Sequence, residues 1–131
     1  MMKLSKKAAV IAVIRNGKIL AISRKPNHTT YGLPGGTLEE AETFEDAVMR
    51  ETYEETGYRA NSIDEFELVY EAFDVEGWKA RVYYLKDPGI EFKNQPGEGH
   101  LVWDDWSRLI AGPFKDFNVD LRQVLESKNL L

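Results

Sequence analysis

The most constraining feature of this sequence is the stretch from Gly35 to Tyr58, in which a pair of glycines precedes an acidic segment with helical periodicity. It predicts a glycine turn followed by an α-helix that begins after Thr43 and ends at Gly57. Thr43 suits an N-cap, Asp46 stands where a capping box has its acid, and Gly57 allows the left-handed backbone that ends many helices. Both ends of the predicted helix are therefore well marked.

The acids of this predicted helix share its apolar side. At about 100° per residue, one face about 120° wide carries apolar residues first and glutamates later. Its members are Phe44, Ala47, Val48, Glu51, Glu54 and Glu55. If the apolar half packs on a core, the three carboxylates lie together at the edge of that core and repel one another unless a cation neutralises them. Ligands that are all oxygen select a hard ion, Mg²⁺ or Mn²⁺.

The alternative interpretation is an acidic helix face in bulk water, with Arg50 and lysine side chains as its ion-pair partners. The apolar residues, however, lie on the acidic side, whereas Met49 and Tyr53 point away from it. This distribution favours a metal site over a solvated face.

The spacing of residues in this stretch resembles the Nudix box of the Nudix hydrolases, the MutT-like pyrophosphohydrolases. The matching positions are Gly36, Glu42, Arg50, Glu51, Glu54, Glu55, Gly57 and Tyr58. Thr52 departs from the pattern, because the family usually has an aliphatic residue there; we expect this to affect packing behind the helix. The resemblance implies an α/β protein with the Nudix fold, a mixed β-sheet sandwiched between α-helices, and one Nudix hydrolase domain over residues 1–131.

The resemblance also implies roles for residues of the box. It implies a site for Mg²⁺, for which Mn²⁺ can substitute, with the ligands Glu51, Glu54, Glu55 and the Gly36 carbonyl. It further implies that Arg50 and Glu42 form an ion pair that orients the carboxylates. Glu51 is the first choice for the general base, since family members use either this glutamate or a downstream acid.

Three residues outside the box are further candidates. Glu98 precedes a segment with a tryptophan and resembles the family's additional metal ligand or base; the alternative is a solvated loop glutamate. Arg24, where a predicted strand ends, is a candidate for a phosphate contact or a solvated residue. Asn118 resembles the asparagine with which MutT-type members read the base, and its alternative role is to cap the last helix.

The remaining sequence predicts strands and two more helices. Predicted strands cover residues 8–14, 18–23, 65–74, 78–85 and 101–103, and predicted helices cover 106–111 and 118–128. Asn16-Gly17 suits the type I′ turn of a hairpin, and residues 65–85 form a second hairpin whose first strand alternates strictly from Phe66 to Ala72. Strands that alternate with helices favour an α/β sandwich.

Composition limits the partners. A net charge of −5 argues against a protein that mainly binds polymeric nucleic acid, and the absence of cysteine excludes disulfides and thiolate metal sites. The apolar run of residues 8–14 is too short to span a bilayer, so we expect no membrane partner and a cytoplasmic location. The expected partner is a small nucleotide, and the chain is expected to be a monomer or a homodimer.

The predicted function is Mg²⁺-dependent hydrolysis of a nucleoside diphosphate linked to another group. The first choice is a MutT-like (deoxy)nucleoside triphosphate pyrophosphohydrolase that releases nucleoside monophosphate and pyrophosphate, with a role in sanitising the nucleotide pool. The residues that mark ADP-ribose and dinucleoside polyphosphate hydrolases in the family are replaced here by Phe73, Val75 and Glu76. Hydrolysis of those two substrates, a non-catalytic nucleotide-binding regulator with the Nudix fold, and a chance match remain the alternatives.

Overall fold

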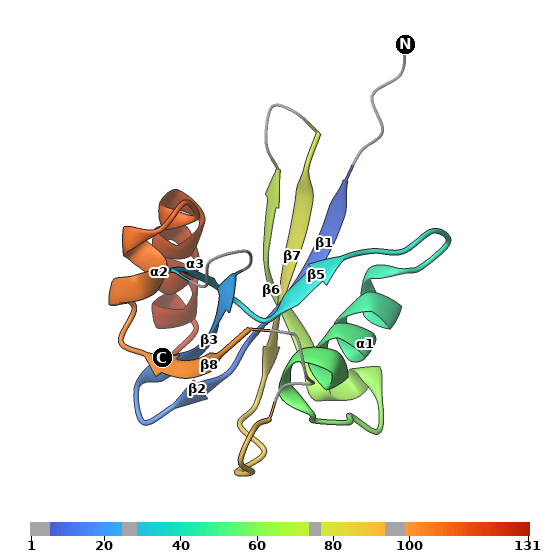
Figure 1. The fold of residues 1–131 in the computed structure, drawn as a ribbon, viewed down its shortest axis with the longest axis horizontal. Helices are drawn as coiled ribbons and strands as arrows, with labels where there is room; N and C mark the ends of the chain where they lie inside the picture. The colour runs from blue at the N-terminus through green and yellow to red at the C-terminus, as the bar shows by residue number, and fades with distance from the viewer. Residues whose placement is uncertain (1–5, 25–28, 74–76, 94–98) are drawn as a thin grey trace.

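The computed structural model describes residues 6–24, 29–73, 77–93 and 99–131, which form two β-sheets and three α-helices (Figure 1). The first sheet has the order β5-β1-β7-β6, with β1 Lys7–Ala12, β5 Gly35–Thr37, β6 Phe66–Phe73 and β7 Lys79–Leu85. The second sheet contains β2 Ile14–Arg15, β3 Lys18–Arg24, β4 Thr30–Gly32 and β8 Leu101–Asp104. The helices are α1 Phe44–Thr56, α2 Ser107–Ala111 and α3 Lys115–Ser127, and a 3₁₀ turn covers Ile63–Glu65.

The first sheet is mixed and is covered on both faces, as the sequence predicted. Strands β1 and β7 run parallel, whereas β5 and β6 are antiparallel to their neighbours. Ala9 and Ile11 of β1 belong to a buried cluster with Phe44, Ala47 and Val48 of α1. Ala12 points to the other face, where the buried cluster includes Leu109, Leu121 and Leu125 of α2 and α3. The sheet is therefore sandwiched between α1 and the α2-α3 pair. None of the described helices is long and apolar enough to cross a membrane.

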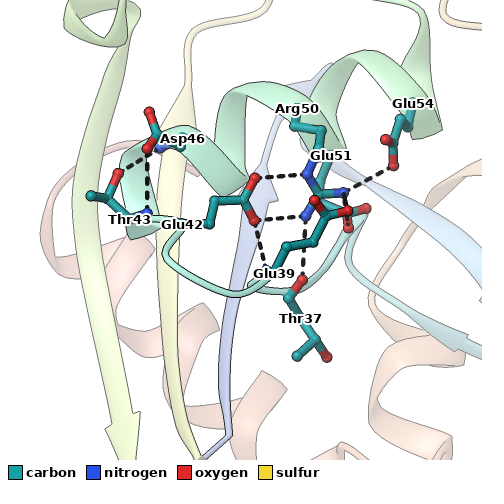
Figure 2. Close-up of polar contacts among 8 residues, drawn as sticks. All are labelled: Thr37, Glu39, Glu42, Thr43, Asp46, Arg50, Glu51 and Glu54. Carbon is teal, nitrogen blue, oxygen red and sulfur yellow. Dashed lines mark hydrogen bonds and ion pairs between the residues drawn. The ribbon is translucent and has the colours of Figure 1, made fainter.

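Helix α1 has the predicted ends. The Oγ1 atom of Thr43 accepts the Asp46 N–H at 3.0 Å, and the Asp46 carboxylate accepts the Thr43 N–H at 3.3 Å, which completes a capping box (Figure 2). Gly57 ends the helix at φ 78°, and its N–H donates to the Tyr53 carbonyl. Thr52 is buried, and its Oγ1 has no hydrogen-bond partner among the described residues, which agrees with the expectation that this position affects packing.

Two predicted features near the start of the chain differ in the structure. Residues 8–14 are not one strand, because the chain passes from the first sheet to the second at Val13 and only β2 forms the hairpin with β3. Gly35 and Gly36 lie in strand β5 rather than in a turn. A Cβ on Gly35 would lie 2.3 Å from the Ala9 carbonyl oxygen, so the missing side chain lets β5 approach β1.

Two predictions later in the chain are also wrong in detail. Strand β6 has a register shift between Leu68 and Tyr70, so the strict alternation breaks and Val69 is buried while Leu68 is 46% exposed. Helix α3 begins at Lys115, three residues before the predicted start. Its N-cap is Phe114, which makes no side-chain capping hydrogen bond, so a search for a polar cap in the sequence does not find this start.

Candidate active site

The acidic end of α1 packs against the glycines of β5. An ideal Cβ on Gly36 would lie 2.6 Å from Oε1 of Glu51, so the carboxylate occupies the space that any larger residue would need. The Gly35 N–H donates to Oε1 of Glu55 at 3.3 Å. Glu55 is 4% exposed and the Glu51 side chain 13% exposed. Two of the three glutamates predicted as metal ligands in α1 are therefore enclosed between the helix and this strand.

Arg50 connects the acids of the site (Figure 2). Its Nε and Nη2 atoms donate to the two carboxylate oxygens of Glu42 at 2.8 and 2.9 Å. Its Nη1 donates to Glu51 at 2.9 Å and to Glu54 at 3.2 Å, and Nη2 also donates to the Thr37 carbonyl at 3.3 Å. The predicted ion pair between Arg50 and Glu42 is confirmed, and it ties the segment between β5 and α1 to the helix.

Arg50 and Glu42 each stabilise the charged form of the other. The hydrogen bonds from Arg50 hold the pKa of the Glu42 carboxyl below its usual range, against a smaller opposing effect of burial. The same contacts, with Glu42 first and Glu51 next, raise the pKa of the Arg50 guanidinium. Both partners are therefore charged at neutral pH, and Arg50 offsets part of the repulsion among the acids.

The three carboxylates do not converge in the way that helical periodicity predicted. Within the described part of the chain, no group of three or more histidine or acidic side chains is arranged to hold a metal ion. Glu51 and Glu54 turn toward Nη1 of Arg50, whereas Glu55 turns toward the Gly35 N–H. The donors are nevertheless all oxygen and lie within one helical turn, and the 42% exposed side chain of Glu54 has room to move. This set of residues fits a hard divalent cation.

Of the three candidates outside the box, Asn118 lies away from the acidic network. Arg24 is the last residue of β3, paired with Thr30, and Glu98 lies outside the described residues. Asn118 is 1% exposed, and its Nδ2 donates to the Leu109 carbonyl at 3.2 Å, so it joins α3 to α2 on the far side of the sheet from α1. Its predicted alternative role as a helix cap is wrong, because Phe114 occupies that position. Its buried Oδ1 has no hydrogen-bond partner in the described residues.

Two main-chain contacts of the site were not predicted from the sequence. The Gly35 N–H and the Thr37 carbonyl hold Glu55 and Arg50 in place, and main-chain groups leave little trace in a sequence. The adjacent Gly35 and Gly36 were the sign of these contacts in the sequence, because two residues without side chains leave space beside the strand for carboxylates.

The outward face of α1 carries a groove. Its volume is about 420 Å³, and it is lined by Met49, Arg50, Tyr53, Glu54, Arg59 and Ala60. The Arg59 guanidinium stacks 4.1 Å from the centre of the Tyr53 ring. Met49 and Tyr53 line this groove, but Met49 is half-buried and also packs against the buried cluster beneath α1, so the prediction that it points away from the core is wrong. Arg50 and Glu54 face both the groove and the acidic network.

Comparison with known proteins identifies related sequences. Residues 5–127 match the family model described as the NUDIX domain. The chain is 43% identical over 81 residues to a MutT-like protein from Streptomyces ambofaciens, covering 62% of this chain and 51% of that protein. It is 40% identical over 65 residues to an ADP-ribose pyrophosphatase from Bacillus subtilis (strain 168), covering 47% and 35% respectively. The chain thus spans about half or less of the length of these relatives.

Solved structures show the same fold. A bifunctional NMN adenylyltransferase/ADP ribose pyrophosphatase from Francisella tularensis, complexed with AMP and a Mn ion, matches with a TM-score of 0.66. The identity is 22%, and the match covers 97% of this chain and 42% of the other. At this identity, the likeness concerns the fold alone.

Proposed function

This chain belongs to the NUDIX family, and on that premise we propose that it hydrolyses a phosphoric anhydride bond in a nucleoside diphosphate linked to another group. We propose a (deoxy)nucleoside triphosphate as the substrate, with nucleoside monophosphate and pyrophosphate as products. The observation that carries the proposal is the acidic end of α1. There Arg50 donates to Glu51 and Glu54, Glu51 lies against Gly36, and Glu55 accepts the Gly35 N–H.

The charges of the site explain why a cation is needed. A nucleoside triphosphate is a polyanion, so the acids alone repel it. We propose that Mg²⁺ or Mn²⁺ is held by Glu51, Glu54 and Glu55, with the Gly36 carbonyl as a further ligand. When bound, the ion neutralises charge on the phosphates and polarises a phosphoryl oxygen.

The residues of the chain then have separate roles. We assign Glu51 as the general base that accepts a proton from the attacking water, because Arg50 fixes its carboxylate at 2.9 Å and Gly36 lies directly against it. Arg50 orients Glu51 and Glu54, and Glu98 is the alternative base or an additional ligand. We assign a phosphate contact to Arg24. The burial of Asn118 and its bond to the Leu109 carbonyl favour a structural role over the predicted contact with a nucleobase.

A second candidate substrate is ADP-ribose. It is favoured by the 40% identity over 65 residues to a protein named ADP-ribose pyrophosphatase. The acidic network does not distinguish the two substrates, because both present a phosphoric anhydride to the same carboxylates. The choice therefore depends on residues that contact the remainder of the substrate.

A substrate panel tests both candidates. The purified chain is incubated with Mg²⁺ or Mn²⁺ and with single (deoxy)nucleoside triphosphates, ADP-ribose or dinucleoside polyphosphates, and products are separated by chromatography. We expect pyrophosphate and a nucleoside monophosphate from a triphosphate. AMP and ribose 5-phosphate from ADP-ribose as the faster reaction would replace our first choice. Binding without turnover of any member of the panel would contradict the hydrolase proposal and favour a regulator.

A further inference from the structure

Arg15 occupies an unusually well-connected position outside the acidic network. It is the last residue of β2, and its side chain is 27% exposed. Its Nε and Nη2 atoms donate to the two carboxylate oxygens of Asp87, each at 2.6 Å, and Nη2 also donates to the Ile90 carbonyl at 2.8 Å. A bidentate contact of this kind fixes the orientation of Arg15 relative to Asp87 as well as their distance, because the guanidinium is planar. Arg15 therefore holds the segment 87–93 that follows β7.

Two aromatic rings lie close to the same guanidinium. The Cζ atom of Arg15 lies 4.5 Å from the centre of the Trp103 ring in β8 and 5.5 Å from that of Phe92. The two rings contact each other, with centroids 5.9 Å apart. Both rings also pack on the buried cluster that contains Phe44, Ala47 and Val48 of α1. Arg15 thus packs on two aromatic side chains, Phe92 and Trp103, which in turn pack on the core beneath α1.

The segment that Arg15 holds is attached to the C-terminal end of α1. The Lys93 N–H donates to the Thr56 carbonyl at 2.8 Å, which satisfies one of the carbonyl groups left open where the helix ends. The Lys93 carbonyl lies against Gly57, where an added Cβ would be only 2.6 Å from its oxygen. Thr56 is fully buried and directly follows Glu54 and Glu55. The position of these two acids therefore depends on the position of residue 93.

We propose that Arg15 is a positioning residue for the candidate active site, which acts through segment 87–93 to fix the end of α1 that carries Glu54 and Glu55. Arg15 contacts none of these acids in the described contacts, so its effect passes through Asp87, Phe92 and Lys93. The inference rests on the proposed function in one respect, namely that Glu54 and Glu55 bind the divalent ion. Its structural part, the coupling between Arg15 and the end of α1, stands independently.

Amide hydrogen exchange of the full chain tests the coupling without any assumption about catalysis. Arg15→Met removes the guanidinium and keeps an unbranched side chain. We expect exchange to accelerate about tenfold or more in residues 87–93 and also at residues 55–57, while α3 is unaffected. The matched control is Arg122→Met, an exposed arginine of α3 that should leave both segments unchanged. Acceleration confined to residues 87–93 would overturn the inference.

Divalent-ion affinity tests the functional part. Mn²⁺ binding is measured by the loss of the free-ion paramagnetic resonance signal, at a temperature where every variant is folded. We expect Arg15→Met to weaken Mn²⁺ binding about three- to tenfold, and Arg15→Lys to restore little, because lysine lacks the planar fork. Asp87→Asn should behave similarly, and the double variant should be no weaker than either single one. Unchanged Mn²⁺ affinity in Arg15→Met would refute the positioning role. If wild-type protein binds no Mn²⁺, that result counts against the proposed function, and hydrogen exchange then decides whether Arg15 is coupled to the end of α1.

Discussion

Replacement of Arg50 by methionine is the perturbation whose size the structure best determines. The side chain of Arg50 is 23% exposed and contacts Glu42 and Glu51, whose side chains are 12% and 13% exposed. Arg50→Met leaves these two carboxylates without their guanidinium partner in a setting only partly open to water. Breaking a fully buried pair costs about 3–5 kcal/mol, and partial access to solvent reduces this, so we expect a loss of about 2–3 kcal/mol in the free energy of unfolding.

Thermal unfolding followed by circular dichroism, at neutral pH and without divalent ions, measures this loss. For a chain of this size, about 1 kcal/mol corresponds to about 3–5 °C, so the midpoint should fall by about 6–15 °C. Arg122→Met is the matched control, because Arg122 and Glu126 are 44% and 55% exposed at a distance of 3.4 Å. This exposed pair should contribute less than about 1 kcal/mol. Equal effects of the two variants would refute the reasoning from burial.

The comparison of wild type with Arg50→Met also gives a pH prediction. Because Arg50 lowers the pKa of Glu42 in the folded state, the stabilisation is complete above the ordinary glutamate pKa and is lost as the pH falls through the lowered value. The difference in stability between wild type and Arg50→Met should therefore shrink as the pH falls below about 4.3, the usual value for a glutamate. Urea unfolding between neutral and acidic pH measures this difference. A difference that stays constant into the acid range would contradict the assignment.

Four further variants test individual residues of α1 and β5. Glu54→Gln and Glu55→Gln should each lower turnover by about 100-fold or more with little change in the melting temperature, since they remove one of several like charges; pyrophosphate release at wild-type rate would contradict the metal assignment. Gly36→Ala should displace the Glu51 carboxylate, because a Cβ at this position would lie 2.6 Å from its Oε1. We expect turnover to fall by about tenfold or more at a small cost in stability. Activity and thermal melts measured on one preparation provide the test. Thr52→Val should raise the free energy of unfolding by about 1 kcal/mol, because it replaces a buried hydroxyl that lacks a partner, and a loss of stability in urea would argue against that burial.

Much of the candidate site follows from local sequence. The ends of α1 are set by Thr43, Asp46 and Gly57 through contacts within a few residues, so they are readable without knowledge of the fold. The side of the helix that carries the acids follows from its period, and the pairing of Arg50 with Glu42 followed from the resemblance to the Nudix box. These contacts join residues that are close in the sequence, so they can be predicted from sequence spacing alone.

Other features depend on neighbours far away in the sequence. The bulge between Leu68 and Tyr70 arises from pairing with β7, and the alternating pattern of the strand carries no sign of it. The position of Asn118 also depends on a partner, the Leu109 carbonyl of a separate helix. A one-residue shift in a strand, or the packing of one helix on another, changes which face a side chain occupies.

The sequence by itself determined that three glutamates share one face of a capped helix, because helical geometry fixes their relative directions within a few turns. Only the tertiary structure decided how those carboxylates are held. Glu51 lies on Gly36, and Glu55 accepts the Gly35 N–H. Arg50 donates to Glu42, Glu51 and Glu54. These contacts require β5 to lie beside the helix, and that placement depends on the pairing of β5 with β1 and on a core built from distant parts of the chain.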